Sequence, residues 1–207
     1  MNIVHQILPV AGQVLLLAVL FAMLAEKLAR DVRKRKLIVA VLLVAGLFVP
    51  VNGLSLSQWL RSALGDLSVI TLVILLNSVV NRLFNVQLLT PPARKNLLSG
   101  IVLVGVLFYP LALGLGPVDP YAFAYTPFWM TVLLSLASVL TWFRGQRDLA
   151  VVLLLPVVAF NLRLLESSNL WDYLLDPILF AYAVVQLLAG RNFGDFKLFF
   201  SAAKVKN

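Results

Sequence analysis

Residues 27–36 read KLARDVRKRK and place six Lys and Arg side chains directly after an uncharged apolar stretch, residues 7–25. The apolar stretch is long enough to cross the hydrocarbon core of a bilayer, which takes about 20 residues. Loops that stay in the cytoplasm are enriched in Lys and Arg. The two features together therefore predict a first transmembrane helix whose C-terminal end lies on the cytoplasmic side.

The whole chain has the composition of a membrane protein. Of its 207 residues, 61% are hydrophobic and 13% are charged, whereas soluble domains have about 45–50% and about 25%. Apolar runs recur along the chain, which predicts an all-α integral membrane protein with about seven transmembrane helices. The expected spans are residues 7–25, 37–54, 67–84, 97–115, 127–143, 149–165 and 174–189. They leave little chain for a soluble domain, so we expect one polytopic membrane domain over residues 1–207.

The distribution of basic residues orients this segmentation. With these seven spans, 15 of the 17 Lys and Arg fall on one side of the membrane, and only Arg61 and Arg163 fall on the other. This bias predicts an N-terminus outside and a C-terminus inside. One span more or fewer would place basic residues on both sides. Short loops and the absence of cysteine favour a multi-pass protein of a bacterial inner membrane.

A short amphipathic segment separates the second and third spans. It reads SLSQWLRSALGD over residues 55–66, and its apolar residues recur at helical spacing. Its polar residues, Arg61 among them, lie on the opposite face. The pattern predicts a short interfacial helix on the outer surface, with Trp59 at the depth of the lipid headgroups.

Two arginines on the outer side are the sharpest candidates for a binding site. Arg163 is expected near the outer end of the sixth span, with Asn161 beside it and Glu166 three residues further on. Arg61, Arg163 and Asn161 could bind an anionic headgroup, a phosphate or a carboxylate. The alternative is that Arg163 extends to the interface and pairs with Glu166 on the same helix face.

Carboxylates on the same side give a second hypothesis. Asp172 and Asp176 are four residues apart and would share a face of one helix, so that they, with Glu166, could act as acid and base in an enzyme. The alternative is that Asp176 caps a helix that begins at Pro177, which would start the helix there and separate the two carboxylates. Asp66 has the same two interpretations, and a helix cap is preferred.

No reaction motif accompanies these residues. The chain has one histidine and no cysteine, so we expect no metal site and no cofactor. Because the basic residues gather at the ends of the spans, we expect lipids and a membrane protein as partners rather than nucleic acid.

Three functions remain open from the sequence. The first is a non-enzymatic membrane subunit of a cell-envelope machinery that makes or exports lipids or lipid-linked glycans. Such a subunit would bind a partner or an anionic headgroup at its outer face. The second is a small membrane enzyme that acts on a lipid phosphate or glycan at the outer leaflet. The third is a transporter, which would need a polar path across the spans, whereas the polar residues gather on one face.

Overall fold

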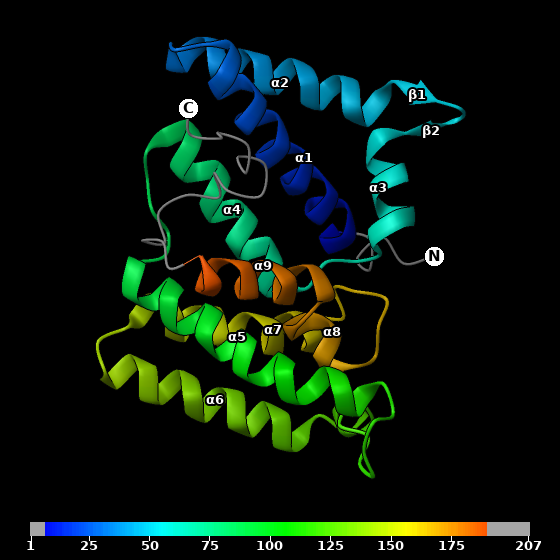
Figure 1. Cartoon of the computed structure of the whole chain (residues 1–207), viewed down its shortest axis with the longest axis vertical. Helices are drawn as coiled ribbons and strands as arrows, with labels where there is room; N and C mark the ends of the chain where they lie inside the picture. The colour runs from blue at the N-terminus through cyan, green and yellow to red at the C-terminus, as the bar shows by residue number, and fades with distance from the viewer. Residues whose placement is uncertain (1–6, 190–207) are drawn as a thin grey trace, which may run out of the picture.

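The computed structural model describes residues 7–189 and confirms the all-α architecture (Figure 1). An antiparallel hairpin of two-residue strands, β1 and β2, precedes α3, and one 3₁₀ helix, η2, precedes α6. The expected positions of the two termini, and the basic residues after 189, lie outside the described residues. The elements are α1 (Ile7–Leu28), α2 (Val32–Phe48), β1 (Pro50–Val51), β2 (Leu54–Ser55), α3 (Leu56–Leu64), α4 (Val69–Phe84), α5 (Pro91–Ala112), η2 (Ala122–Tyr125), α6 (Phe128–Phe143), α7 (Arg147–Asn161), α8 (Leu170–Leu174) and α9 (Pro177–Leu188).

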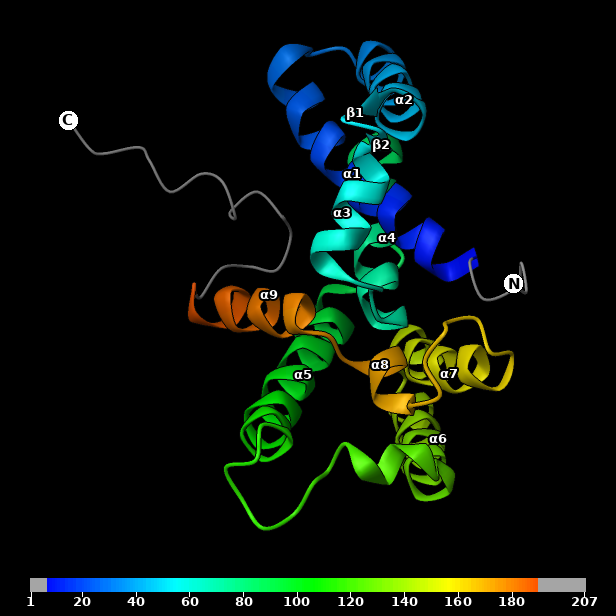
Figure 2. The same cartoon turned by 90° about the vertical axis from the view of Figure 1, so that its right-hand side faces the viewer.

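Helix α4 holds the two halves of the molecule together. It packs against α1 on one side and against α7, α8 and α9 on the other. Its N-terminal half is buried almost completely, including Ile70, Ile74 and Leu75. Around it, α1 pairs with α2, α5 with α9, and α6 with α7. Helices α2 and α6 thus lie at opposite ends of the long axis of the molecule (Figures 1 and 2).

The connections between helices gather at two ends of the structure. The left side of Figure 1 holds the α1–α2 turn, the α4–α5 loop, the α6–α7 turn and the end of α9. We call this the basic end, because it carries every described Lys and Arg except two. The right side holds the β hairpin, α3, the α5–α6 loop and the α7–α8 loop. We call this the acidic end, since it carries two arginines and five carboxylates: Arg61, Arg163, Asp66, Asp119, Glu166, Asp172 and Asp176.

Helix length does not support the seven expected spans. Among residues 7–189, two helices are long and apolar enough to cross a membrane, α5 and the Leu8–Leu28 portion of α1. Helices α4, α6 and α9 are apolar but have 16, 16 and 12 residues. Helices α2 and α7 are also short, and each begins with charged residues. The two long apolar helices give weak support for membrane association.

The second expected span, residues 37–54, ends too late. Helix α2 begins at Val32, so that residues 33–36 of the basic block form its first turns, and it ends at Phe48. The chain then reverses through Asn52 and Gly53, whose φ angles are 51° and 84°. Asn-Gly is the preferred pair for a two-residue hairpin turn with positive φ at both positions. The short helix expected after it is confirmed as α3, with a capping box formed by Ser55 and Gln58, whereas its place at a membrane interface stays a prediction.

The sixth and seventh spans also need correction. Helix α7 ends at Asn161, because Arg163 adopts a left-handed conformation with φ 51°. The amides of Arg163 and Leu164 donate to the carbonyls of Phe160 and Ala159 at 2.9 and 3.0 Å, which is the pairing of a Schellman motif. Arg163 and Glu166 therefore do not share a helix face. The last expected span, residues 174–189, begins too early, because its helix, α9, runs from Pro177 to Leu188. Asp172 lies in the separate helix α8, so Asp172 and Asp176 do not share a helix face either.

The packing of α5 on α9 predicts opposite effects for two glycines of α5. A β-carbon at Gly105 would lie 2.3 Å from ring carbon Cδ2 of Phe180, whereas one at Gly100 would meet no atom within 4 Å. Gly105→Ala is expected to lower the free energy of unfolding by about 1–3 kcal/mol through overpacking. Gly100→Ala is expected to raise it by up to about 1 kcal/mol, since alanine favours helix. Unfolding in mixed micelles measures both, and equal effects would contradict this packing.

Candidate functional site

The carboxylate of Asp176 joins the first turns of two helices at the acidic end. Its Oδ1 accepts a hydrogen bond from the Leu179 amide at 2.8 Å, which confirms it as the N-cap of α9. Its Oδ2 accepts from the Ser68 amide at 2.9 Å and from Thr71 Oγ1 at 2.5 Å, both at the start of α4. Asp176 is buried. Because helix N-termini favour negative charge, one carboxylate stabilises both α4 and α9.

Asp172 instead accepts hydrogen bonds from two hydroxyl groups. Tyr121 donates to its Oδ2 at 2.9 Å, and Ser167 Oγ donates to the same oxygen at 2.5 Å. Burial raises the pKa of Tyr121 well above its ordinary value of 10, and the hydrogen bond to Asp172 adds to the shift. The phenol therefore stays protonated and remains a donor through the neutral pH range. Asp172 thus fixes the α5–α6 loop against the α7–α8 loop.

Further bonds join the same two loops. The side-chain amide of Asn169 donates to the Tyr121 carbonyl at 2.9 Å, and Trp171 Nε1 donates to the Pro120 carbonyl at 2.9 Å. The buried hydroxyl of Tyr173 accepts from the Leu165 amide at 3.1 Å and donates to nearby backbone carbonyls. These bonds use side chains to satisfy backbone groups of irregular segments, which otherwise would be costly to bury.

Arg61 of α3 lies between two carboxylates. Its Nε is 3.0 Å from Asp66 Oδ1, and its Nη2 is 3.5 Å from Glu166 Oε1. The three side chains are partly exposed and together carry one negative charge. Asp66 is therefore a partner of Arg61 rather than the cap of α4, a position that Ser68 holds through a bond to the Thr71 amide. The bonds connect α3 to the α7–α8 loop.

The other two expected anion ligands have local backbone roles. The side-chain amide of Asn161 donates to the Val157 carbonyl in its own helix at 2.7 Å. Arg163 occupies the left-handed position of the helix terminus described above, and its residue is exposed. Glycine is the usual residue at such a position, because a β-carbon costs about 1–2 kcal/mol there. Arg61, Arg163 and Asn161 remain predicted anion ligands, since nothing in this geometry tests that role.

The basic end holds two arginines with little solvent exposure, for which the sequence predicts only a role in topology. Arg82 of α4 donates to Glu26 of α1 at 2.7 Å, and its side chain is 6% exposed. Arg94 of α5 is buried and donates to the Tyr182 hydroxyl of α9. Arg82 and Glu26 could have been paired from the predicted topology, which puts both at the inner ends of their spans. For Arg94, the predicted topology indicates no partner.

The carboxylates of the acidic end are engaged in bonds that join segments of the fold. Asp176 receives three donors and Asp172 receives two, while Glu166 faces Arg61. Between residues 7 and 189, no three side chains of His, Cys, Asp or Glu lie close enough together to hold a metal ion. The arrangement can hold loops and helix ends rigidly.

Comparisons with protein-family models, with curated proteins and with solved structures find nothing that matches this chain.

Two isosteric substitutions distinguish the two aspartates. Asp176→Asn keeps an acceptor for the cap of α9 but places an NH₂ group against the Ser68 amide, so that two donors face each other, whereas the Thr71 hydroxyl can rotate and accept. Because each unsatisfied buried donor costs about 1–3 kcal/mol, the free energy of unfolding should fall by about 2–4 kcal/mol. Asp172→Asn should cost about 1 kcal/mol, since both of its partners are hydroxyls that can rotate and accept. Denaturation in mixed micelles measures the difference, and an unchanged Asp176→Asn variant would contradict the shared cap.

Proposed function

We propose that this chain is a non-enzymatic, multi-pass subunit of a cell-envelope machinery of the bacterial inner membrane, one that handles lipids or lipid-linked glycans. Its acidic end faces outward and docks a membrane protein partner, and its basic end faces the cytoplasm. In this proposal all seven apolar segments enter the membrane, with the N-terminus outside and the C-terminus inside. The short helices would then require partial crossings or local thinning of the bilayer.

The apolar surface supports a membrane setting for more than the two long helices. In α6, the residues Trp129, Leu133 and Phe143 are 72%, 64% and 83% exposed, and Ser138 is the one buried residue of the helix. In α2, Val41, Val44 and Phe48 are exposed in the same way. Water-soluble proteins rarely expose contiguous apolar faces of this extent. Lipid tails would cover both faces without cost.

The observation that carries the proposal is the engagement of the outer carboxylates. An acid or base needs access to a substrate proton, within about 2.6–3.2 Å or through one water. Asp176 is buried under three donors, and Asp172 is shared by two hydroxyls. These bonds favour a rigid scaffold over a catalytic centre.

The charge of the acidic end favours a protein over an anionic headgroup as its ligand. That end has two arginines and five carboxylates, and Arg61 already lies between two of the carboxylates. Glu166 keeps 58% of its side chain exposed. A partner with basic side chains would complement this surface, because opposite charges across an interface steer association and select the partner.

Site-specific photo-crosslinking tests this proposal. A photoreactive amino acid at Ser62 or Ser168, both exposed at the acidic end, should crosslink one membrane protein in native membranes. The same residue at Gln87, exposed at the basic end, is the matched control and should not. Glu166→Lys should reduce crosslinking from Ser168 severalfold, since it reverses the exposed charge.

Two results would contradict the proposal. One is equal crosslinking from all three positions, which would indicate random encounters in the membrane. The other is turnover of a lipid phosphate or glycan by the purified chain alone, with that activity lost in Asp172→Asn.

A further inference from the structure

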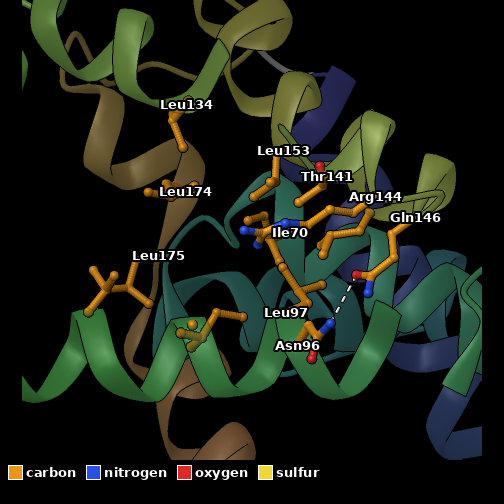
Figure 3. A pocket seen from close by; sticks show the side chains of 14 residues that line it. Ile70, Asn96, Leu97, Leu134, Thr141, Arg144, Gln146, Leu153, Leu174 and Leu175 are labelled. Carbon is orange, nitrogen blue, oxygen red and sulfur yellow. Dashed lines mark hydrogen bonds between the residues drawn. The ribbon is translucent and has the colours of Figure 1, made fainter. Parts of the chain in front are cut away.

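A groove with a cavity volume of about 480 Å³ opens between α5 on one side and α6 and α7 on the other. Ile70 of α4 and Leu174 and Leu175 at the end of α8 also line it (Figure 3). Ligand pockets in proteins are about 300–1,000 Å³ and mostly apolar, with a few polar groups that orient the ligand. The cavity has that size and that character.

The polar groups of the cavity gather at one end. Thr141, Arg144 and Gln146 come from the end of α6 and the α6–α7 turn, and Asn96 from the start of α5. The side-chain amide of Asn96 donates to Gln146 Oε1 at 2.9 Å and bridges the two walls. All four belong to the basic end. The remaining residues that line the cavity are apolar, most of them leucine and isoleucine.

Arg144 gives this polar end a charge. Figure 3 shows its side chain extending into the cavity rather than away from it. Within the part of the chain that the structure describes, no carboxylate forms a salt bridge with Arg144. The nearby Asp148 instead accepts from the amide and hydroxyl of Thr90 at 2.7 and 2.8 Å. A guanidinium above an apolar wall is best complemented by an anion that brings its own apolar chain.

We propose that this groove binds one anionic phospholipid of the cytoplasmic leaflet. Its phosphate lies on Arg144, with Asn96 and Gln146 beside it, and one acyl chain lies along the wall formed by Leu97, Ile101 and Leu153. Arginine presents paired donors that match a phosphate, and basic pockets between helices on the cytoplasmic side are typical headgroup sites. The site is at the end opposite the proposed partner surface and does not depend on that surface, whereas its leaflet rests on the proposed orientation.

Gly100 offers a way to close the groove without disturbing the protein. It lines the cavity, and a β-carbon there would meet no atom within 4 Å. Larger side chains at this position therefore point into the space assigned to the acyl chain. Gly100→Phe fills more of the groove than Gly100→Leu, and the two together give a graded block.

Native mass spectrometry of the full chain in mild detergent tests the proposal. Phosphatidylglycerol and phosphatidylcholine with identical acyl chains are the probes. The wild-type chain should retain one phosphatidylglycerol, with at least about tenfold preference over phosphatidylcholine, as expected for one charge-assisted contact. Arg144→Gln should remove that preference, while Gly100→Leu and Gly100→Phe should progressively reduce binding of both lipids.

Arg33→Gln is the matched control, because Arg33 is exposed at the basic end and outside the groove. It should leave the preference unchanged. An equal loss in Arg33→Gln and Arg144→Gln would overturn the proposal in favour of diffuse attraction. Unchanged lipid retention in both Gly100 variants, with melting temperatures equal to that of the wild type, would overturn the proposal. It would show that no acyl chain occupies the groove.

Discussion

The segregation of charge between two ends of the helices is the constraint on which the rest of this structure depends. In the proposed membrane setting, charged side chains are costly in the hydrocarbon layer, so each apolar helix would have to place its flanking charges at one end or the other. The helices therefore alternate in direction, and every connection between residues 7 and 189 lies at the basic or the acidic end (Figure 1). The helices between the ends can then be apolar on nearly all sides.

The two ends use charge differently. At the acidic end, carboxylates bind amides and hydroxyls of neighbouring segments, as Asp176 and Asp172 do. Each bond fixes the start of a helix or an irregular loop. These bonds explain how the short helices are held in place against one another. At the basic end, Arg82 pairs across helices with Glu26, whereas Arg144 extends into an apolar groove. The same residue type thus serves packing at one position and an open cavity at another.

Much of the helical framework could be predicted from local sequence. The Asp176-Pro177 pair marks the start of α9, and the spacing of apolar residues marks α3, because both signals depend only on near neighbours. The Asn52-Gly53 turn carried an equally local signal that the hydropathy pattern obscured. Arg163 gave no such signal, since an arginine in a left-handed helix terminus is selected by its surroundings and not by propensity.

The candidate site was harder to predict than the framework. Arg61 seemed isolated in sequence, but folding brings Glu166 to it from 105 positions away. Contacts of this kind depend on how α3 lies against the α7–α8 loop, which no single-helix pattern encodes. The groove at Arg144 is a similar case, because it exists only where α5 and α6 are held apart by their separate partners, α9 and α7.

Cysteine accessibility tests the two-sided arrangement most directly, and the chain is suited to it because it contains no cysteine. Single cysteines would replace Ser62, Val118 and Ser168 at the acidic end, and Lys34 and Gln87 at the basic end. In intact cells, a membrane-impermeant maleimide should label the first three and should reach the other two only after permeabilisation. Labelling of Lys34→Cys or Gln87→Cys in intact cells, or protection of Ser62→Cys and Ser168→Cys, would contradict the arrangement.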